Sequence, residues 1–335
     1  MMHKKVVLSG IRATGKLHLG NYLGAMKYFV KLSKDEENSC YFFIANLHTL
    51  TTRMDPHDIL RDLKEIVLTY VSIGIDPESS VIFAQSSVPE TSELNWLLAC
   101  LTSVAELEKM PHFKEKRDMK ETLHESVNVG LLTYPVLMAA DILGPLANRV
   151  PVGEDQHPHV ELARDLARRF NALYGETFPV PELLEGEAIR VPGLDGKGKM
   201  GKSNQNTIDL MDSPEEVLKK IGKAVTDTAR VRKSDVGNPL NCGLYTLHQL
   251  LSSGAELMEV HAGCTSAKMG CVDCKKILVK NINQLLAPIQ AKRLELNEKG
   301  SAYALEVLHE GGKKARKKIA ATVENVKEKM GVPSY

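Results

Sequence analysis

The sequence has few of the features that mark an exported or membrane-spanning protein. Its basic start is followed by only four apolar or small residues before Gly10, too few for the apolar core of a signal peptide. The longest apolar stretch, residues 130–147, contains Asp141 and two prolines, so we expect no membrane span. Six cysteines in 335 residues are too few for a disulfide-rich secreted chain. We therefore expect a cytosolic protein whose cysteines are thiols or metal ligands.

Internal repeats and low-complexity tracts are also lacking, and the apolar and charged fractions, 43% and 25%, are those of an ordinary globular protein. The charge is uneven. Residues 275–335 hold 13 Lys and Arg against 6 Asp and Glu, a net charge of +7, which leaves −6 for the rest of a chain of net charge +1. This segment is either a solvated helix face or a surface that binds a polyanion, and charge alone does not distinguish the two.

The first half of the chain alternates compact β-like runs with amphipathic helical stretches. Residues 5–9, 40–45 and 80–85 are apolar and rich in β-branched or aromatic side chains, and residues 56–74 are a helical stretch between two of them. This alternation predicts an α/β fold, a Rossmann-like doubly wound parallel sheet. Ligands of such sheets bind at the carboxyl ends of the strands.

The second half has a different pattern. The strand signal fades after about Pro179, and residues 190–206 are rich in Gly, Pro and Lys, which is typical of an exposed loop. Ser213 precedes a helical pattern as a helix cap should, and helical patterns continue to the end. We therefore expect a Rossmann-like domain over 1–188, a loop over 189–207 and a helical domain over 208–335.

Two segments nearly match a nucleotide-binding P-loop, G-x-x-x-x-G-K-[ST]. Residues 10–17 have a strand before them and a helix after them, but the last position is Leu17, which has no hydroxyl for a magnesium ion. Residues 196–203 match in full, but they follow a polar loop and no helix follows that could hold a phosphate. Neither segment is a P-loop.

The two segments are interpretable as a pair. His18-Leu19-Gly20-Asn21 resembles the HIGH motif of class I aminoacyl-tRNA synthetases, and residues 199–203, KMGKS, resemble their KMSKS motif. Glycine lets a nucleotide approach the backbone, and a helix N-terminus with an imidazole N–H suits phosphate oxygens. A mobile loop with two lysines can close over departing pyrophosphate.

Further segments resemble the tryptophanyl-tRNA synthetases over essentially the whole chain, notably residues 131–143 and 150–171. This resemblance implies a Rossmann-like catalytic domain and a helical tRNA-binding domain. It also implies activation of L-tryptophan with Mg²⁺ and ATP, transfer to tRNA(Trp), and a homodimer. The alternatives are a tyrosyl-tRNA synthetase and, from another class, an iron–sulfur nucleic-acid-binding regulator built on a synthetase scaffold.

Asp141 is the residue on which specificity would depend. Tyr134, Met138 and Asp141 are spaced i, i+4, i+7 and so share one helical face. A carboxylate among apolar residues is costly unless a donor satisfies it. By itself the pattern favours a structural acid that accepts from a backbone N–H. The resemblance instead makes Asp141 the acceptor of the indole N–H, and leaving such an acceptor unpaired costs about 1–3 kcal/mol.

The resemblance implies roles for further residues. The amino-acid pocket would comprise Leu8, Gly10, His48, Met138, Asp141, Val150, Val152 and Gln156. ATP would be bound by Arg12, Ala13, Thr14, Gly20, Asn21, Gly153, Glu154, Asp155, Val191, Lys199, Met200, Gly201, Lys202 and Ser203. The catalytic groups would be His18, Lys116, Lys199 and Lys202. Gly201 replaces the serine of the family motif. Ordering the more flexible glycine backbone costs about 0.5–1 kcal/mol of free energy. We expect a working loop with altered closure, and an inactive relative is the alternative.

The cysteines fall into two groups. Cys40 and Cys100 lie in apolar runs and are expected to be small buried hydrophobes. The spacing of the other four, Cys242, Cys264, Cys271 and Cys274, is C-x21-C-x6-C-x2-C. This resembles the C-x22-C-x6-C-x2-C of a subset of tryptophanyl-tRNA synthetases that bind a [4Fe–4S] cluster. The first gap is one residue shorter here, so Cys242 is the least certain ligand. Structural Zn²⁺ is the first alternative and free thiols the second.

Overall fold

The structure is a computed structural model that describes residues 4–52, 55–122, 127–185 and 189–332. The chain forms two compact units. The sheet unit comprises Met1–Gly15, Tyr28–Ala188 and Lys299–Tyr335, and the helical unit comprises Lys16–Lys27 and Ile189–Glu298. One boundary between the units falls after residue 188. Residues 16–27 group with the helical unit, and residues 299–335, which include the C-terminal helix, group with the sheet unit.

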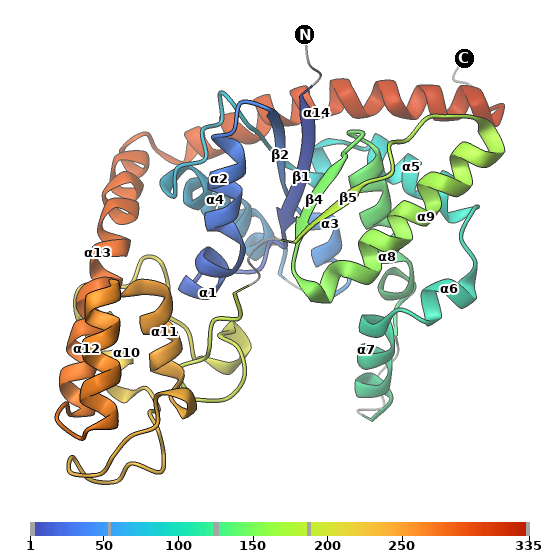
Figure 1. Ribbon diagram of the computed structural model, residues 1–335. Coiled ribbons are helices and arrows are strands. Elements are labelled where there is room, and N and C mark those ends of the chain that lie inside the picture. The colour runs from blue at the N-terminus through green and yellow to red at the C-terminus, as the bar shows by residue number, and fades with distance from the viewer. Residues whose placement is uncertain (1–3, 53–54, 123–126, 186–188, 333–335) are drawn as a thin grey trace. The chain divides into compact units, whose positions relative to one another are not determined.

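The sheet unit contains five parallel strands (Figure 1): β1 (Lys5–Ile11), β2 (Asn38–Ile44), β3 (Val81–Ala84), β4 (Arg149–Val152) and β5 (Glu182–Glu185). Their order is β3-β2-β1-β4-β5, which confirms the doubly wound parallel sheet. The three expected strands are β1, β2 and β3. The short strands β4 and β5, RVPV and ELLE, lack the apolar β-branched pattern and were not predicted. The strand order reverses between β1 and β4, and doubly wound sheets bind ligands at this reversal.

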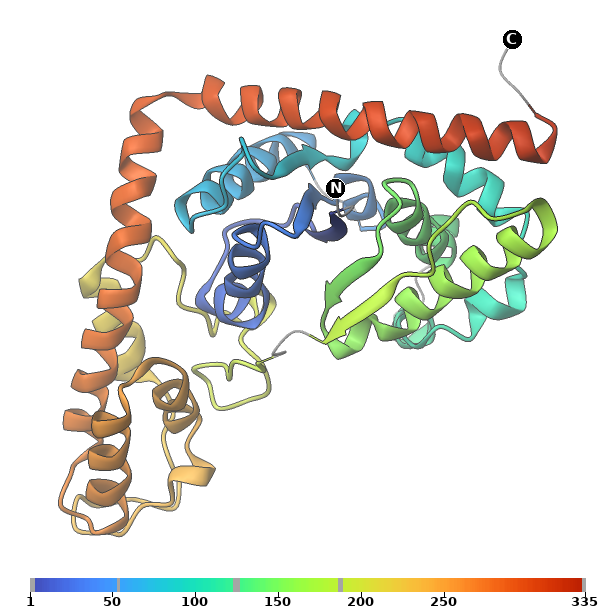
Figure 2. The ribbon, with the colours of Figure 1, turned by 45° about the horizontal axis from the view of Figure 1, so that its top comes forward.

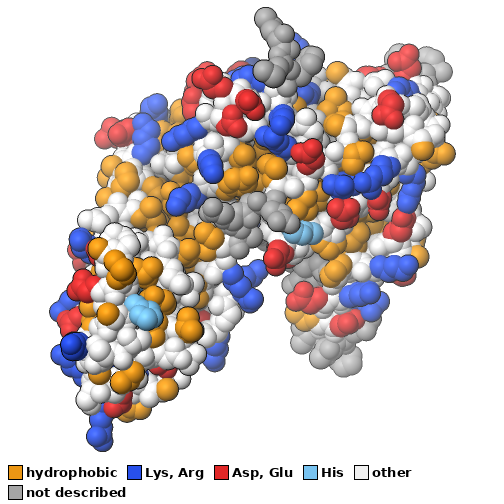
Figure 3. All heavy atoms as spheres, viewed as in Figure 1, with side chains coloured by type: hydrophobic (Ala, Val, Ile, Leu, Met, Phe, Trp, Pro, Cys, Tyr) orange, Lys and Arg blue, Asp and Glu red, His pale blue; other side chains and the backbone are white. Residues whose placement is uncertain are grey.

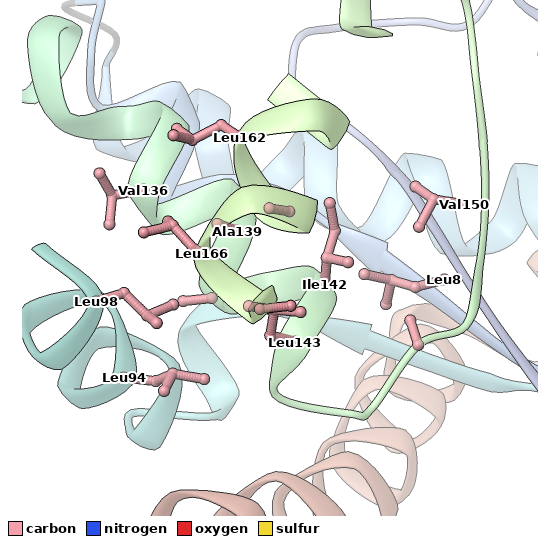
Figure 4. Packing of buried hydrophobic residues seen from close by; sticks show 14 of the residues in the cluster. Leu8, Leu94, Leu98, Val136, Ala139, Ile142, Leu143, Val150, Leu162 and Leu166 are labelled. Carbon is pink, nitrogen blue, oxygen red and sulfur yellow. The ribbon is translucent and has the colours of Figure 1, made fainter. Parts of the chain in front are cut away.

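Helices surround this sheet: α2 (Lys27–Ser33), α3 (Asn46–Thr49), α4 (Pro56–Ser72), α5 (Glu90–Ala99), α6 (Val104–Glu108), α7 (Pro111–Thr122), α8 (Val129–Leu143), α9 (His157–Tyr174) and α14 (Ser301–Met330). α8 is the central element of the core (Figure 4). Its side chains Val136, Ala139 and Leu143 belong to the same buried cluster as residues of α5 and α9, and Ile142 lies beside Leu8 and Val150 of the sheet. The Asn128 side chain caps α8 by accepting the Leu131 N–H at 2.8 Å.

The C-terminal helix α14 packs along the edge strand β3 and against α4 and α5 (Figure 2). Gly311 permits this packing, because a Cβ there would lie 1.8 Å from the carbonyl oxygen of Ile82. The buried side chains of α14 include Ala315, Ile319 and Val323. α14 therefore covers an edge that would otherwise expose unpaired backbone groups.

The basic stretch at residues 313–318 lies on α14. Lys313 pairs with Glu310 at 2.8 Å and Arg316 with Glu90 at 2.7 Å. On the face in Figure 3, Lys and Arg side chains of the sheet unit are interspersed with Asp and Glu. Both interpretations of this stretch, a solvated helix face and a polyanion-binding surface, stay open.

The helical unit contains α1 (Leu19–Asn21), a π-helical turn (Tyr22–Met26), α10 (Pro214–Lys223), α11 (Gly243–Leu251), α12 (Gly254–Thr265) and α13 (Cys271–Glu298). The side chain of Ser213 accepts the Glu216 N–H at 3.3 Å, so the predicted cap of α10 is confirmed. Two backbone hydrogen bonds join residues 17–19 to residues 208–210 within this unit, Leu19 N–H to Ile208 O at 2.8 Å and Leu210 N–H to Leu17 O at 3.1 Å. Among the helices that the structure describes, none has the length and apolarity needed to span a membrane.

Candidate active site

A cavity of about 340 Å³ opens in the sheet unit at the reversal of strand order between β1 and β4. It is lined by the second half of β1, by α3, by one face of α8 and by β4. All eight residues expected to form the amino-acid pocket line it, namely Leu8, Gly10, His48, Met138, Asp141, Val150, Val152 and Gln156. Gly10 is required by close packing, because a Cβ there would lie 2.6 Å from the ring of Phe43. The volume is within the usual range for a small-molecule site.

Asp141 lies in the wall of this cavity and is only 6% exposed. Its carboxylate accepts from side chains, not from a backbone N–H as the helical pattern alone would favour. Nε2 of Gln85 lies 2.9 Å from Oδ1 and 2.8 Å from Oδ2, and Nε2 of His48 lies 2.9 Å from Oδ2. Burial raises the pKa of Asp141, and the hydrogen bonds from His48 and Gln85 oppose that rise. Gln85 and His48 thus supply the side-chain hydrogen bonds to this buried acid.

The aromatic wall of the cavity is held by a second polar pair. The hydroxyl of Tyr134 lies 2.7 Å from Nε2 of His159, which is 1% exposed. Burial raises the pKa of Tyr134 to about 12, so its hydroxyl stays protonated. The Tyr134 ring stands edge-on to His48 with centroids 6.0 Å apart. These contacts fix the ring plane that a flat ligand would meet.

Arg12 lies beside the polar residues at the rim. It lines the cavity together with Thr51, Asp155 and Gln156. Its Nη2 donates to Oγ1 of Thr52 at 3.0 Å. A polar rim above an apolar wall suits a ligand that has an apolar ring and a charged end.

Sequence reasoning missed three of these polar residues: Gln85, Thr51 and His159. Gln85 is the last residue of the predicted strand 80–85, and this position was the available signal. His159 carried no local signal, since its contact with Tyr134 joins residues 25 positions apart. Thr51 carried none either.

The two signature motifs lie together in the helical unit. His18 is 5% exposed, and burial together with the charge of Lys202 lowers its pKa to about 4. The imidazole is therefore neutral at pH 7. A Cβ on Gly20 would lie 2.9 Å from Nδ1 of His18 and 3.2 Å from Cβ of Met200, so glycine is needed where the motifs meet.

The KMGKS loop is anchored from beneath by Asn206, which is 3% exposed. Its Oδ1 accepts the Gly201 N–H at 2.8 Å and its Nδ2 donates to Oδ1 of Asp195 at 2.8 Å. The side chain of Met200 is buried, whereas Lys199 and Lys202 are exposed. The loop thus has a fixed base and two lysine side chains at its surface.

The remaining expected ATP-binding and phosphate-facing residues are placed as follows. In the sheet unit Ala13 is buried, Thr14 and Gly153 are partly exposed, and Glu154 and Asp155 are exposed. In the helical unit Asn21 ends α1 and its Oδ1 accepts the His18 N–H at 3.1 Å, and the carbonyl of Val191 accepts the Met200 N–H at 2.8 Å. Lys116 lies in α7 and Ser203 in the turn Lys202–Asn204, with side chains outside the described atoms.

The four clustered cysteines line one small cavity of about 30 Å³ in the helical unit. Burial and the other three sulfurs raise the pKa of Cys274 to about 12. Nε2 of His248 lies 3.3 Å from its Sγ, and Nη1 of Arg230 lies 3.8 Å from Sγ of Cys264. Within the described residues, no three His, Cys, Asp or Glu side chains form an arrangement that could hold a metal ion.

The other two cysteines differ from each other. Cys40 is buried as expected, and burial raises its pKa to about 12. Cys100 is exposed, so the expectation of a buried side chain was wrong for this residue. It is the residue that caps the C-terminus of α5.

The chain is similar to known proteins over almost its whole length. Residues 2–287 match the family of class I tRNA synthetases described as W and Y. The chain is 46% identical to tryptophan–tRNA ligase of Thermotoga maritima over 330 residues, 97% of this chain and 99% of that one. It is 42% identical to the enzyme of that name from Deinococcus radiodurans, over 97% of this chain and 98% of that one.

A solved structure is similar over the same span. Tryptophanyl-tRNA synthetase from Campylobacter jejuni, complexed with ADP and tryptophan, superposes with a TM-score of 0.85 at 35% identity. The similarity covers 97% of this chain and 99% of that one. The chain therefore belongs to the tryptophan–tRNA ligases, within the class I tRNA synthetases.

Proposed function

We propose that the sheet-unit cavity binds L-tryptophan and that the chain activates it with ATP and attaches it to tRNA(Trp). The buried acid of the cavity carries the proposal, because a lone acceptor in an apolar wall suits one ring N–H. Two full-length relatives that are tryptophan–tRNA ligases support it. On this proposal Asp141 accepts from the indole nitrogen, and the apolar side chains enclose the ring.

The proposed first step is in-line attack of the tryptophan carboxylate on the α-phosphate of ATP. The new C–O–P linkage forms as the bond to pyrophosphate breaks, giving tryptophanyl-adenylate. Neutral His18 offers an N–H to phosphate oxygens, and exposed Lys199 and Lys202 bring positive charge to the leaving group. We assign Lys116 to the same task. No covalent enzyme intermediate is required, since positioning and charge stabilisation supply the catalysis.

Two groups of residues are assigned to ATP. Gly20 and Asn21 belong to the helical unit, where the packing of Gly20 against Met200 keeps both motifs available to one nucleotide. The residues of the sheet unit are Arg12, Ala13, Thr14, Gly153, Glu154 and Asp155. Mg²⁺ would neutralise charge on the transferred phosphates. Within the described residues no cluster of acids and histidines could hold the ion alone, so we infer that it binds with ATP.

In the second step the acyl group passes from the adenylate to the terminal ribose of the tRNA. The net charge of +7 on residues 275–335 favours contact with a polyanion. The homodimer and the cytosolic location remain predictions.

We further propose that Cys242, Cys264, Cys271 and Cys274 hold a [4Fe–4S] cluster, with Zn²⁺ as the alternative. Their side chains line one cavity, and the Arg230 guanidinium lies at Cys264, where it would offset thiolate charge. Four thiolates suit iron or zinc in their chemistry. The sulfurs would have to move closer together to share one metal group, because no three of the described side chains are arranged to hold a metal ion. A cluster would supply a structural link between α11, α12 and α13, and no step of the reaction is assigned to it.

Two other functions are less well supported. A tyrosyl-tRNA synthetase would also place an acid near a ring substituent, but the Thermotoga maritima and Deinococcus radiodurans relatives, at 46% and 42% identity, are tryptophan–tRNA ligases. An iron–sulfur nucleic-acid-binding regulator would need neither the HLGN histidine nor the lysines of the loop, yet His18, Lys199 and Lys202 are all present in one unit.

Exchange of pyrophosphate into ATP tests the proposal. We expect exchange that depends on tryptophan and is near background with tyrosine. Exchange with tyrosine alone would favour the tyrosyl enzyme. No exchange with either amino acid, from a chain that melts cooperatively, would overturn the proposed activity.

A further inference from the structure

Gln85 is a buried polar residue behind the pocket acid. It begins the turn Gln85–Ser87 at the carboxyl end of β3 and is 1% exposed. It is not among the residues that line the cavity, so it would not touch a ligand bound there. It reaches the cavity through two residues that line it, the carboxylate of Asp141 and the backbone of His48.

The orientation of the Gln85 amide is determined by the start of α3. Its Oε1 accepts the backbone N–H of Leu47 at 3.1 Å and that of His48 at 3.3 Å. The NH₂ end must therefore face Asp141, and a flipped amide would set NH₂ against two backbone donors. The backbone of α3 thus decides which end of the amide meets the acid.

The two oxygens of Asp141 are not equivalent. Oδ2 accepts from Gln85 at 2.8 Å and from His48 at 2.9 Å, whereas Oδ1, among the described residues, accepts from Gln85 alone at 2.9 Å. Each carboxylate oxygen can accept about two hydrogen bonds. Oδ1 is therefore the oxygen with capacity for a further donor.

We infer that Gln85 is a positioning residue for specificity: it holds the Asp141 carboxylate so that Oδ1 is presented to the ring N–H of the ligand. This inference rests on the proposed function. Gln85 occupies one acceptor site on each oxygen and prevents rotation of the carboxylate. The preference for a ring that carries an N–H then depends on a residue that never contacts the ring.

The test compares tryptophan with β-(3-benzothienyl)-L-alanine, in which sulfur replaces the ring N–H. Values of kcat/KM in pyrophosphate exchange are measured for both substrates with the full-length chain and with Gln85→Met, which keeps the bulk but removes the amide. We expect the ratio of kcat/KM for tryptophan to that for the analogue to fall about tenfold, because a carboxylate that can rotate no longer makes a well-aligned hydrogen bond with the ring N–H.

Two variants separate this role from loosened packing. Gln85→Glu keeps the shape and the acceptor for α3 but removes the donor, so two carboxylates must share a proton and the ratio should also fall. Ser86→Ala is the matched control, because Asn46 Nδ2 donates to Oγ of Ser86 at 2.8 Å in the same contact between α3 and the turn. Ser86→Ala should leave the tryptophan-to-analogue ratio of kcat/KM within about twofold of the wild-type value.

Equal losses for both substrates in the Gln85 variants would overturn the inference and make Gln85 merely structural. If Gln85→Met fails to fold, the ratio in Gln85→Glu decides the same point. A wild-type chain that does not activate tryptophan would overturn the proposed function and this inference together. Tryptophan activation with an unchanged ratio would overturn the inference alone.

Discussion

The imidazole of His48 and the carboxylate of Asp141 meet in the wall of the cavity, with 2.9 Å between Nε2 and Oδ2. They are 93 positions apart in the chain, and α3 and α8 bring them together. Because the pair lies in a buried setting, its hydrogen bonds are stronger than they would be in water. An acid held in this way can stay an acceptor inside an otherwise apolar pocket.

Replacement of Asp141 should remove most of the specificity for tryptophan. Asp141→Ala leaves the indole N–H and two protein donors unpaired, so we expect kcat/KM for tryptophan to fall about 10- to 100-fold. In Asp141→Asn, kcat/KM for tryptophan should fall by a similar amount, because the NH₂ of the new side chain would face the donors Gln85 and His48. Asp165→Asn, an exposed acid on α9, is the control and should keep full activity. Full activity in Asp141→Ala would remove Asp141 from the tryptophan pocket.

His18 should make stability sensitive to acid. An exposed histidine has a pKa of 6.5, whereas the pKa of His18 in the folded chain is about 4, so between these values the unfolded chain binds a proton that the folded chain does not. The contribution of neutral His18 to the free energy of unfolding is fully present above pH 6.5. It is lost as the pH falls toward 4, at up to about 1.4 kcal/mol per pH unit. In urea unfolding, the free energy of unfolding should fall less between pH 6.5 and pH 4 in His18→Gln than in wild type.

The control for this measurement is His57→Gln, an exposed histidine at the start of α4, which should behave as wild type. An identical acid-induced loss of stability in His18→Gln and wild type would contradict the lowered pKa of His18.

The loop lysines should act on charge that develops in the transition state. Lys199→Ala and Lys202→Ala should each lower kcat about 100-fold, with a smaller effect on KM for tryptophan. Lys197→Ala, an exposed lysine of the same loop, is the matched control and should be near wild type. Normal adenylate formation in both variants would show that the loop is not catalytic.

Restoring the family serine should be tolerated. Among the described atoms, the nearest neighbour of a Cβ on Gly201 would be the Lys199 carbonyl oxygen at 3.9 Å. Gly201→Ser should therefore leave exchange unchanged or raise it slightly, through lower backbone entropy in the unclosed loop. A large loss of kcat in this variant would show that loop closure here depends on glycine.

The cysteine site should bind iron. Anaerobic purification should give a brown protein with about four irons per chain, the content of a four-cysteine cubane. Cys264→Ser should lose the colour, whereas Cys100→Ser should keep it, because Cys100 is exposed at the end of α5. One zinc per chain with no iron would replace the cluster by a structural zinc site. Absence of both metals would leave free thiols.

The sequence by itself determined the local elements and the residue types of the site. The apolar runs at 5–9, 40–45 and 80–85 became β1, β2 and β3, and Ser213 caps α10 as expected. The spacing of Tyr134, Met138 and Asp141 placed all three on the cavity face of α8. These features depend on backbone periodicity and on contacts within one turn, which are readable from neighbouring residues.

Only the tertiary structure decided how distant segments share partners. α14 belongs with the sheet because Gly311 allows close packing on Ile82, and the segment 16–27 belongs with the helical unit because Leu17 and Leu19 pair with residues 208–210. The role of Gln85 arises only where α3 and α8 meet it. Such contacts join residues tens of positions apart, and their free energy depends on burial and geometry that no local pattern contains.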